Sequence, residues 1–200
     1  MTPLRMLIAA TIVVIGTVPA QAEKLSLSAI SNYLNKLNTA EAQFTQINND
    51  NTISTGTIYL KRPGRARFEY NPPTKALVVA GGSQVAIFDG KSNAGPQQYP
   101  LKRTPLNLIL AKNVNLNRAK MVVGHSYDGT ATTVTAQDPD NPDVGTIELK
   151  FTANPTELRQ WIITDNTGSK TTVVLGELTT GKPLRSSLFS ITAAVKAWSR

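Results

Sequence analysis

Few side chains in this sequence are of the types that perform acid–base or metal chemistry. Its 200 residues include one histidine, His125, and no cysteine. A zinc site needs several nitrogen and sulfur ligands, so none is predicted. His125 would act as a general base only if an acid and a nucleophile converged on it, and no G-x-S-x-G motif is present. We therefore predict that His125 is a surface residue near a hairpin end.

The aspartates of "DPDNPDVG" are the second candidate for chemistry. Asp138, Asp140 and Asp143 lie close together in the sequence, and oxygen ligands at alternate positions can hold calcium. Two prolines interrupt the run, however, and no glycine stands at the sixth position, so a solvated loop is predicted. No phosphate-binding glycine loop and no pair of glycosidase carboxylates can be picked out either. The sequence predicts neither an enzyme nor a cofactor site.

The most informative polar residue is Arg62, in "GTIYLKRPGRARFEYNPP" at 56–73. Ile58 and Leu60 alternate as on one face of a strand, and Arg62 falls on that same apolar face. Two interpretations remain open. A register break at Pro63 would turn the guanidinium out to solvent. Alternatively, the charge lies inside an apolar cleft, where its five donors bond to helix ends or to a lid. Such an arrangement could act as a latch that ligand entry opens.

The first 22 residues have the layout of a secretory signal peptide. Arg5 precedes an apolar run from Met6 to Val18, and Ala20-Gln21-Ala22 forms an A-x-A cleavage site. We predict cleavage after residue 22, with an uncleaved membrane anchor as the alternative, and a single domain over 23–200. Export to the periplasm is expected.

The absence of cysteine excludes disulfides and a lipid anchor. The net charge of +8 is consistent with binding to an anionic surface or with simple solubility. Export from the cytoplasm argues against nucleic acid as a partner.

Two helices and about ten strands are predicted. Leu27, Ile30, Leu34 and Leu37 form the stripe of an amphipathic helix that Ser26 or Ser28 could cap. "TPLNLILA" at 104–111 predicts a short, buried helix with Thr104 as N-cap and Pro105 at the first helical position. Residues 91–99 are predicted to be a loop. The predicted strands are 42–47, 53–62, 65–71, 75–80, 84–88, 120–127, 130–137, 145–152, 158–164, 170–177 and a short one near 186–191.

Short strands in meander order favour an antiparallel sheet. Too many of them are amphipathic for two short helices to cover a flat sheet. We therefore predict a mainly β fold with helices (α+β): a curled antiparallel sheet that forms an incomplete barrel, closed by helices over a hydrophobic cavity. Such a cavity suits an apolar ligand. The residues expected to line it are Ile58, Leu60, Ala66, Phe68, Tyr70, Leu106, Ile109 and Leu110.

The sequence resembles the LolA-type periplasmic carriers of outer-membrane lipoproteins from about Leu27 to Ile191. Their signature stretch is similar to "GTIYLKRPGRARFEYNPP", and "AEAQFTQ" at 40–46, "ALVVAGGSQVAIFD" at 76–89 and "TPLNLILA" are similar to further segments. Phe68 and Ala86 stand where the family often has tryptophan. The tail "TAAVKAWSR" after Phe189-Ser190-Ile191 also departs from the family's Pro-rich tail.

The resemblance implies a function without catalysis. The cavity would receive the acyl chains of lipoproteins. An inner-membrane lipoprotein-releasing ABC transporter would load the carrier, and an outer-membrane receptor lipoprotein would unload it. Arg62, followed by Pro63, would bond to the lid in the closed state of a monomeric carrier. Two alternatives are kept: a periplasmic module of the same fold that senses a lipid or lipoprotein, and, less favoured, an exported hydrolase.

Overall fold

The computed structural model describes residues 23–92, 95–104 and 106–199. The predicted signal peptide, 1–22, lies outside the described residues, as does Pro105. In these described ranges, no helix is both long and apolar enough to cross a membrane. The division into a cleaved leader and a single domain over 23–200 therefore stays a prediction.

All the described strands belong to one 12-stranded sheet with the order β6-β5-β4-β3-β2-β1-β11-β10-β9-β8-β7, and β12 pairs with β1. Every pairing is antiparallel. The two edges, β6 and β7, do not meet, so the barrel is incomplete. The strands are β1 (Thr39–Ile47), β2 (Ile53–Lys61), β3 (Arg65–Tyr70), β4 (Ala76–Gly81), β5 (Gln84–Asp89), β6 (Gln97–Pro100), β7 (Val122–Tyr127), β8 (Thr132–Gln137), β9 (Gly145–Thr152), β10 (Glu157–Asp165), β11 (Lys170–Leu175) and β12 (Thr179–Thr180).

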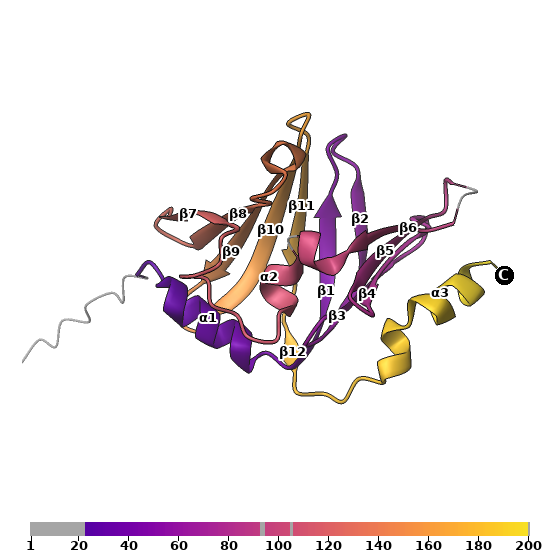
Figure 1. Ribbon diagram of the computed structural model, residues 1–200, viewed down its shortest axis with the longest axis horizontal. Coiled ribbons are helices and arrows are strands. Elements are labelled where there is room, and N and C mark those ends of the chain that lie inside the picture. Colours follow the sequence, from indigo (N-terminus) through magenta and orange to yellow (C-terminus); the bar gives the residue numbers. More distant parts are fainter. Residues whose placement is uncertain (1–22, 93–94, 105, 200) are drawn as a thin grey trace, which may run out of the picture.

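The sheet curls around two helices. In Figure 1, α1 (Leu27–Lys36) and α2 (Leu106–Leu110) lie on the inner side of the curl, whereas α3 (Ile191–Trp198) lies apart, beside the β4 end. Three short 3₁₀ helices connect elements: η1 (Leu101–Arg103), η2 (Pro142–Val144) and η3 (Ser186–Phe189). The predicted fold class, a curled antiparallel sheet closed by helices, is confirmed.

The first helix forms as its sequence predicts. Ser26 is its N-cap, and the Ser26 hydroxyl accepts a hydrogen bond from the amide of Ala29 at 3.0 Å. Ile30 and Leu34 are completely buried on the face toward the sheet. The Tyr33 hydroxyl extends from the same helix to the amide of Leu158 on β10. The apolar stripe therefore fixes α1 over the inner side of the second half of the sheet.

The short second helix differs in detail from its prediction. It spans five residues rather than 104–111, and Leu108, Ile109 and Leu110 are all buried. The Thr104 hydroxyl donates to the carbonyl of Leu101 in η1, and the amide of Asn107 donates to the backbone carbonyl of Thr104. The prediction of a short, buried, apolar helix is confirmed, and the Thr104 cap stays a prediction.

Two further corrections concern strands. Residues 97–99 belong to β6 rather than to a loop, because Tyr99 pairs with Val85 and extends the sheet by one strand. The strand predicted near 186–191 is wrong, since η3 is followed by α3 there. Ser190 caps α3 by accepting from the amide of Ala193 at 3.2 Å. Two adjacent alanines then favour helix over strand, a signal that the sequence interpretation did not use.

The sheet buries apolar side chains on both faces. Alternate side chains of β4 and β5 point to opposite faces of the sheet. Ala80 and Val85 belong to the large cluster on the inner face, whereas Val79 and Phe88 belong to a small cluster on the outer face. The outer cluster is covered by α3, where the rings of Phe88 and Trp198 lie 5.3 Å apart. The inner cluster contains the candidate site.

Candidate ligand-binding cavity

An apolar cavity of about 230 Å³ lies on the inner side of the curled sheet. Strands from both halves of the sheet contribute to its wall, together with Thr104 and α2. Its lining residues are Gln46, Phe68, Tyr70, Val78, Val85, Ile87, Tyr99, Thr104, Leu106, Ile109, Ile147, Leu149, Trp161, Ile163, Thr171 and Val173. Polar atoms enter this wall at only a few positions, which is the usual composition of a site for an apolar ligand.

A row of aromatic rings crosses the cavity wall. The Phe44 ring lies 5.1 Å from Tyr70 and 6.0 Å from Phe68, and Phe68 lies 6.0 Å from Trp161, each pair edge to face. Gly56 makes room for this row, because a Cβ at that position would come within 2.7 Å of the Phe44 ring. The glycine of the sequence motif is thus required by the packing of the ring above it.

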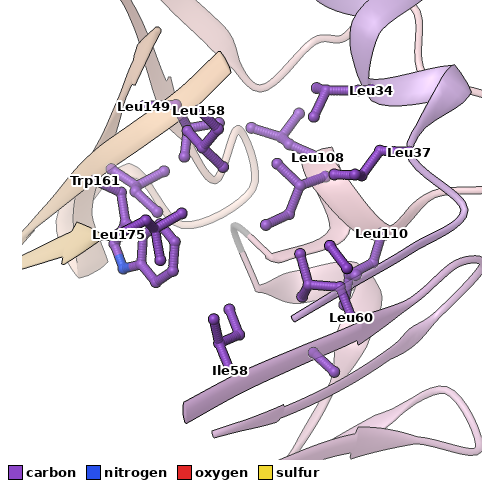
Figure 2. Close-up of a cluster of buried hydrophobic side chains, with 14 of the residues drawn as sticks. Leu34, Leu37, Ile58, Leu60, Leu108, Leu110, Leu149, Leu158, Trp161 and Leu175 are labelled. Carbon is purple, nitrogen blue, oxygen red and sulfur yellow. The ribbon is translucent and has the colours of Figure 1, made fainter. Parts of the chain in front are cut away.

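Both halves of the sheet and the helices converge on this interior. Figure 2 shows side chains of β2 facing those of β9 and β10, with Leu108 of α2 between them. The labelled side chains are Leu34, Leu37, Ile58, Leu60, Leu108, Leu110, Leu149, Leu158, Trp161 and Leu175. The two helices therefore pack into the concave face and do not merely border it.

Polar bonds join α1 to the segment that follows α2. Asn35 donates to the carbonyl of Val114 and accepts from its amide, each at 2.9 Å. The Ser31 hydroxyl accepts from the amide of Leu116 at 3.0 Å. These bonds make one covering unit of α1, α2 and residues 111–117, which we call the lid.

Arg62 connects the sheet to this lid. Its side chain points to the inner side, which is the second of the two interpretations left open by the sequence, and its Nη2 donates to the backbone carbonyl of Ala111 and to Oδ1 of Asn35 at 3.3 Å. Burial lowers the pKa of the Arg62 guanidinium. Its Nε is buried and has no partner among the described residues. A second bond, from the amide of Gly64 to the carbonyl of Leu110, lies beside it.

The predicted lining residues fall into two groups. Phe68, Tyr70, Leu106 and Ile109 line the cavity. Ile58, Leu60, Ala66 and Leu110 are each at most 3% exposed in the core around it. Pro63 is exposed in the β2–β3 turn.

The sequence interpretation missed the residues that the second half of the sheet contributes. Trp161 and Val173 line the cavity from β10 and β11. They reach the first half only because β1 pairs with β11, bringing Thr45 opposite Val174 across a long separation in the chain. Alternation marks Trp161 as an inward residue of its strand, but it does not give the pairing of distant strands.

The two groups considered for chemistry lie away from the cavity wall. His125 is half-buried on β7, where its Nε2 lies 2.8 Å from the carbonyl oxygen of Leu25. Asp138 accepts from the amide of Asp140 and the side chain of Asn141, and these bonds lower the pKa of its carboxyl. Among the described residues, no three His, Cys, Asp or Glu side chains form a possible metal site.

An open antiparallel barrel with an apolar, helix-covered cavity defines a binding protein for an apolar ligand. Comparison with known proteins specifies the family. Residues 35–192 match the family model described as outer membrane lipoprotein carrier protein LolA. The chain therefore belongs to this family, as the sequence resemblance predicts.

Curated relatives agree with this assignment. The chain is 26% identical over 183 residues to an outer-membrane lipoprotein carrier protein of Coxiella burnetii, covering 87% of this chain and 85% of the relative. A shorter match to the protein of the same name in Methylococcus capsulatus is 33% identical over 75 residues, 35% of this chain and 36% of the relative. These relatives are named as carriers and not as enzymes.

Solved structures with a similar arrangement are more distant. A putative outer membrane lipoprotein-sorting protein domain from Vibrio parahaemolyticus has a TM-score of 0.49 and 7% identity, with 85% of this chain and 97% of that chain covered. A LolA superfamily protein from Nitrosomonas europaea has a TM-score of 0.43 and 8% identity, with 84% and 99% covered.

Proposed function

We propose that this protein carries the acyl chains of lipoproteins through the periplasm, from an inner-membrane lipoprotein-releasing ABC transporter to an outer-membrane receptor lipoprotein. The observation that carries the proposal is the apolar cavity under the lid, in a member of the lipoprotein carrier family. Acyl chains cross water poorly because each exposed CH₂ costs about 0.8 kcal/mol. A carrier needs no catalytic group, only a wall that shields the chains.

The size of the cavity implies that the lid moves during loading. About 230 Å³ is more than the roughly 150 Å³ that can hold one benzene molecule, but it is little for several long acyl chains. Loading then requires α2 and the core side chains beneath it, such as Leu108 and Leu110, to move away from the sheet. The structure corresponds to the closed state of the lid in this scheme.

Arg62 is the latch of the proposed cycle. Its bonds to Ala111 and Asn35 join the sheet to the lid, so displacement of the lid by acyl chains would break them. An unpaired guanidinium in a partly buried site is costly, which favours closing again and releasing the ligand. Energy for loading would come from the transporter.

The test begins with the mature protein, purified natively and extracted with organic solvent. Bound acyl lipid or lipoprotein is expected, as is uptake of lipoprotein from energised inner-membrane vesicles. A protein that is ligand-free and takes no lipoprotein from such vesicles would refute the carrier function. Turnover of ester or glycoside substrates would instead favour the hydrolase alternative.

A further inference from the structure

A polar groove continues from the apolar cavity at one end of the sheet. Gln46, Tyr70 and Thr171 line both spaces, so cavity and groove meet at these three residues. All three lie at the same end of the sheet: Gln46 and Tyr70 near the C-terminal ends of β1 and β3, and Thr171 near the N-terminal end of β11. The groove has a volume of about 800 Å³ and extends over the β1–β2 and β3–β4 turns.

The junction is built from hydrogen-bonded side chains. The Tyr70 hydroxyl donates to Oε1 of Gln46 at 2.8 Å, and Nε2 of Gln46 donates to Oδ1 of Asn48 at 2.7 Å. Asn48 in turn donates to the Thr52 hydroxyl at 2.9 Å. Burial raises the pKa of the Tyr70 hydroxyl to about 12, so it stays protonated at physiological pH. An apolar wall thus changes to a continuous polar one at Tyr70.

The groove is polar but balanced in charge. Its ionisable lining residues are Asp50, Asp89, Lys75 and Lys91, two of each sign. Lys75 is moreover directed to α3, where its Nζ lies 5.6 Å from the centre of the Trp198 ring. The remaining lining is mostly hydroxyl, amide and backbone groups. Such a surface suits a neutral ligand rich in carbonyl and amide groups better than it suits a phosphate.

We propose that this groove is a second subsite, which receives the neutral glyceryl-ester and cysteinyl-peptide head of an acylated lipoprotein while its chains occupy the cavity. The inference rests on the proposed function, because only a ligand with chains in the cavity places a head at Tyr70 and Thr171. The diacylglycerol esters and the peptide amides of such a head match the donors and acceptors of the junction.

The subsite lies at the opposite end of the β2–β3 hairpin from the lid latch. Lys61 pairs with Arg65 beside Arg62, whereas Gly56 pairs with Tyr70. At about 3.4 Å per strand residue, the two ends of the ladder are roughly 17 Å apart. A head bound in the groove therefore leaves the bonds of Arg62 to the lid free to break and reform.

Three probes separate the groove from the cavity in titrations of the mature protein. They are an apolar naphthylamine dye, a synthetic N-acetyl dipalmitoylglyceryl-cysteinyl peptide amide without charged side chains, and phosphatidylglycerol with the same two chains. The near-isosteric double variant Thr52→Val/Thr74→Val removes two hydroxyls that line the groove but not the cavity. We expect it to bind the lipopeptide roughly 10- to 30-fold more weakly and the dye within about twofold of wild type. Thr57→Val, on the other face of β2, is the matched control and should change neither.

The outcomes distinguish the subsite from the carrier function itself. A wild-type preference for the lipopeptide over phosphatidylglycerol, lost in the double variant, supports the subsite. Equal weakening of dye and lipopeptide would show damage to the cavity and overturn the proposal. Unchanged lipopeptide binding, or an equal loss for phosphatidylglycerol, would also overturn it. If wild-type protein binds none of the three probes, the proposed function fails together with the subsite.

Discussion

The guanidinium of Arg62 donates to the backbone carbonyl of Ala111, one residue beyond the end of α2. Arg62 follows β2, so this bond helps to join the sheet to the lid, together with the bonds from Arg62 to Asn35 and from the Gly64 amide to Leu110. The acceptor is a main-chain atom, which no substitution at Ala111 removes. The function of the contact is therefore best tested from the arginine side.

Replacing Arg62 with leucine is expected to leave a folded protein that accepts lipoprotein but delivers it poorly. The bonds to Ala111 and Asn35 exist only when the lid is closed, and charge-assisted hydrogen bonds contribute about 1.5–3 kcal/mol each before the cost of desolvation. Their loss should raise ligand affinity about tenfold and slow release. Transfer from loaded carrier to liposomes containing the receptor lipoprotein measures this effect.

Arg185→Leu is the matched control for that experiment. Its side chain is exposed in the segment between β12 and η3, outside the lid as defined above. It should transfer lipoprotein at the wild-type rate. If Arg62→Leu also transfers normally, Arg62 is an ordinary strand-end residue and the latch is refuted.

Filling the cavity should abolish ligand binding without unfolding the protein. Val173 lines the cavity, whereas Val174 points to the other face of the same strand and is 39% exposed. Val173→Phe has empty space available, so its free energy of unfolding should change by no more than about 1 kcal/mol. We expect at least a tenfold loss of dye and lipopeptide affinity in titrations.

Val174→Phe adds the same volume outside the cavity and should bind both probes normally. Wild-type affinity in Val173→Phe would mean that acyl chains bind elsewhere. A large loss of stability in Val173→Phe, followed by urea denaturation, would show that the site cannot take the ring.

The sequence predicts the fold well where alternation and turn residues agree. The β2–β3 hairpin around Pro63-Gly64 and the β7–β8 hairpin around Asp128-Gly129 are both as expected. The prediction of secondary structure fails where alternation or turn residues give only a weak signal. Residues 97–100 form an edge strand because β5 offers a partner, and residues 191–198 form a helix that Ser190 caps.

Only the part of the candidate site that lies in the first half of the sheet can be predicted from the sequence. Phe68 and Tyr70 can be assigned to the cavity because they alternate within a local hairpin. Trp161, Leu149 and Val173 cannot, since their contribution depends on the pairing of β1 with β11. Local periodicity gives the face on which a side chain lies, but the partner across the barrel is a tertiary property.

Gly56 is expected to be intolerant of even one methyl group. A Cβ there would lie 2.1 Å from the carbonyl oxygen of Glu69 and 2.7 Å from the Phe44 ring. Gly56→Ala should lower the free energy of unfolding by about 1–3 kcal/mol, as overpacking typically does. Urea denaturation followed by circular dichroism measures the change. Gly95→Ala, where a Cβ meets nothing within 4 Å, is the control, and equal stability of both variants would contradict the packing argument.

Stability should fall in acid because of four turn aspartates. Hydrogen bonds from neighbouring residues hold the carboxyl pKa of each below its usual value; the residues are Asp50, Asp128, Asp138 and Asp165. A carboxyl with a lowered folded-state pKa stabilises the fold above its unfolded pKa of about 3.9 and loses that contribution as the pH falls through the folded value.

The urea concentration at the midpoint of unfolding should therefore decrease as the pH is lowered from 5 to 2. A variant with all four residues changed to asparagine keeps turn-forming amides but cannot titrate, so its midpoint should decrease less over the same range. An identical decrease in the variant and in wild type would assign acid sensitivity to other groups.

The helix α3 is expected to stabilise the protein without taking part in ligand binding. Trp198 packs against Phe88 on the outer face of the sheet, the face opposite the cavity. Trp198→Ala should lower the free energy of unfolding by about 2–3 kcal/mol, because it removes a large, partly buried ring. Its affinity for the apolar dye should stay at the wild-type value. Lys196→Ala, exposed on the same helix, is the control for both measurements. A large loss of dye binding in Trp198→Ala alone would show that the outer face and the cavity are coupled.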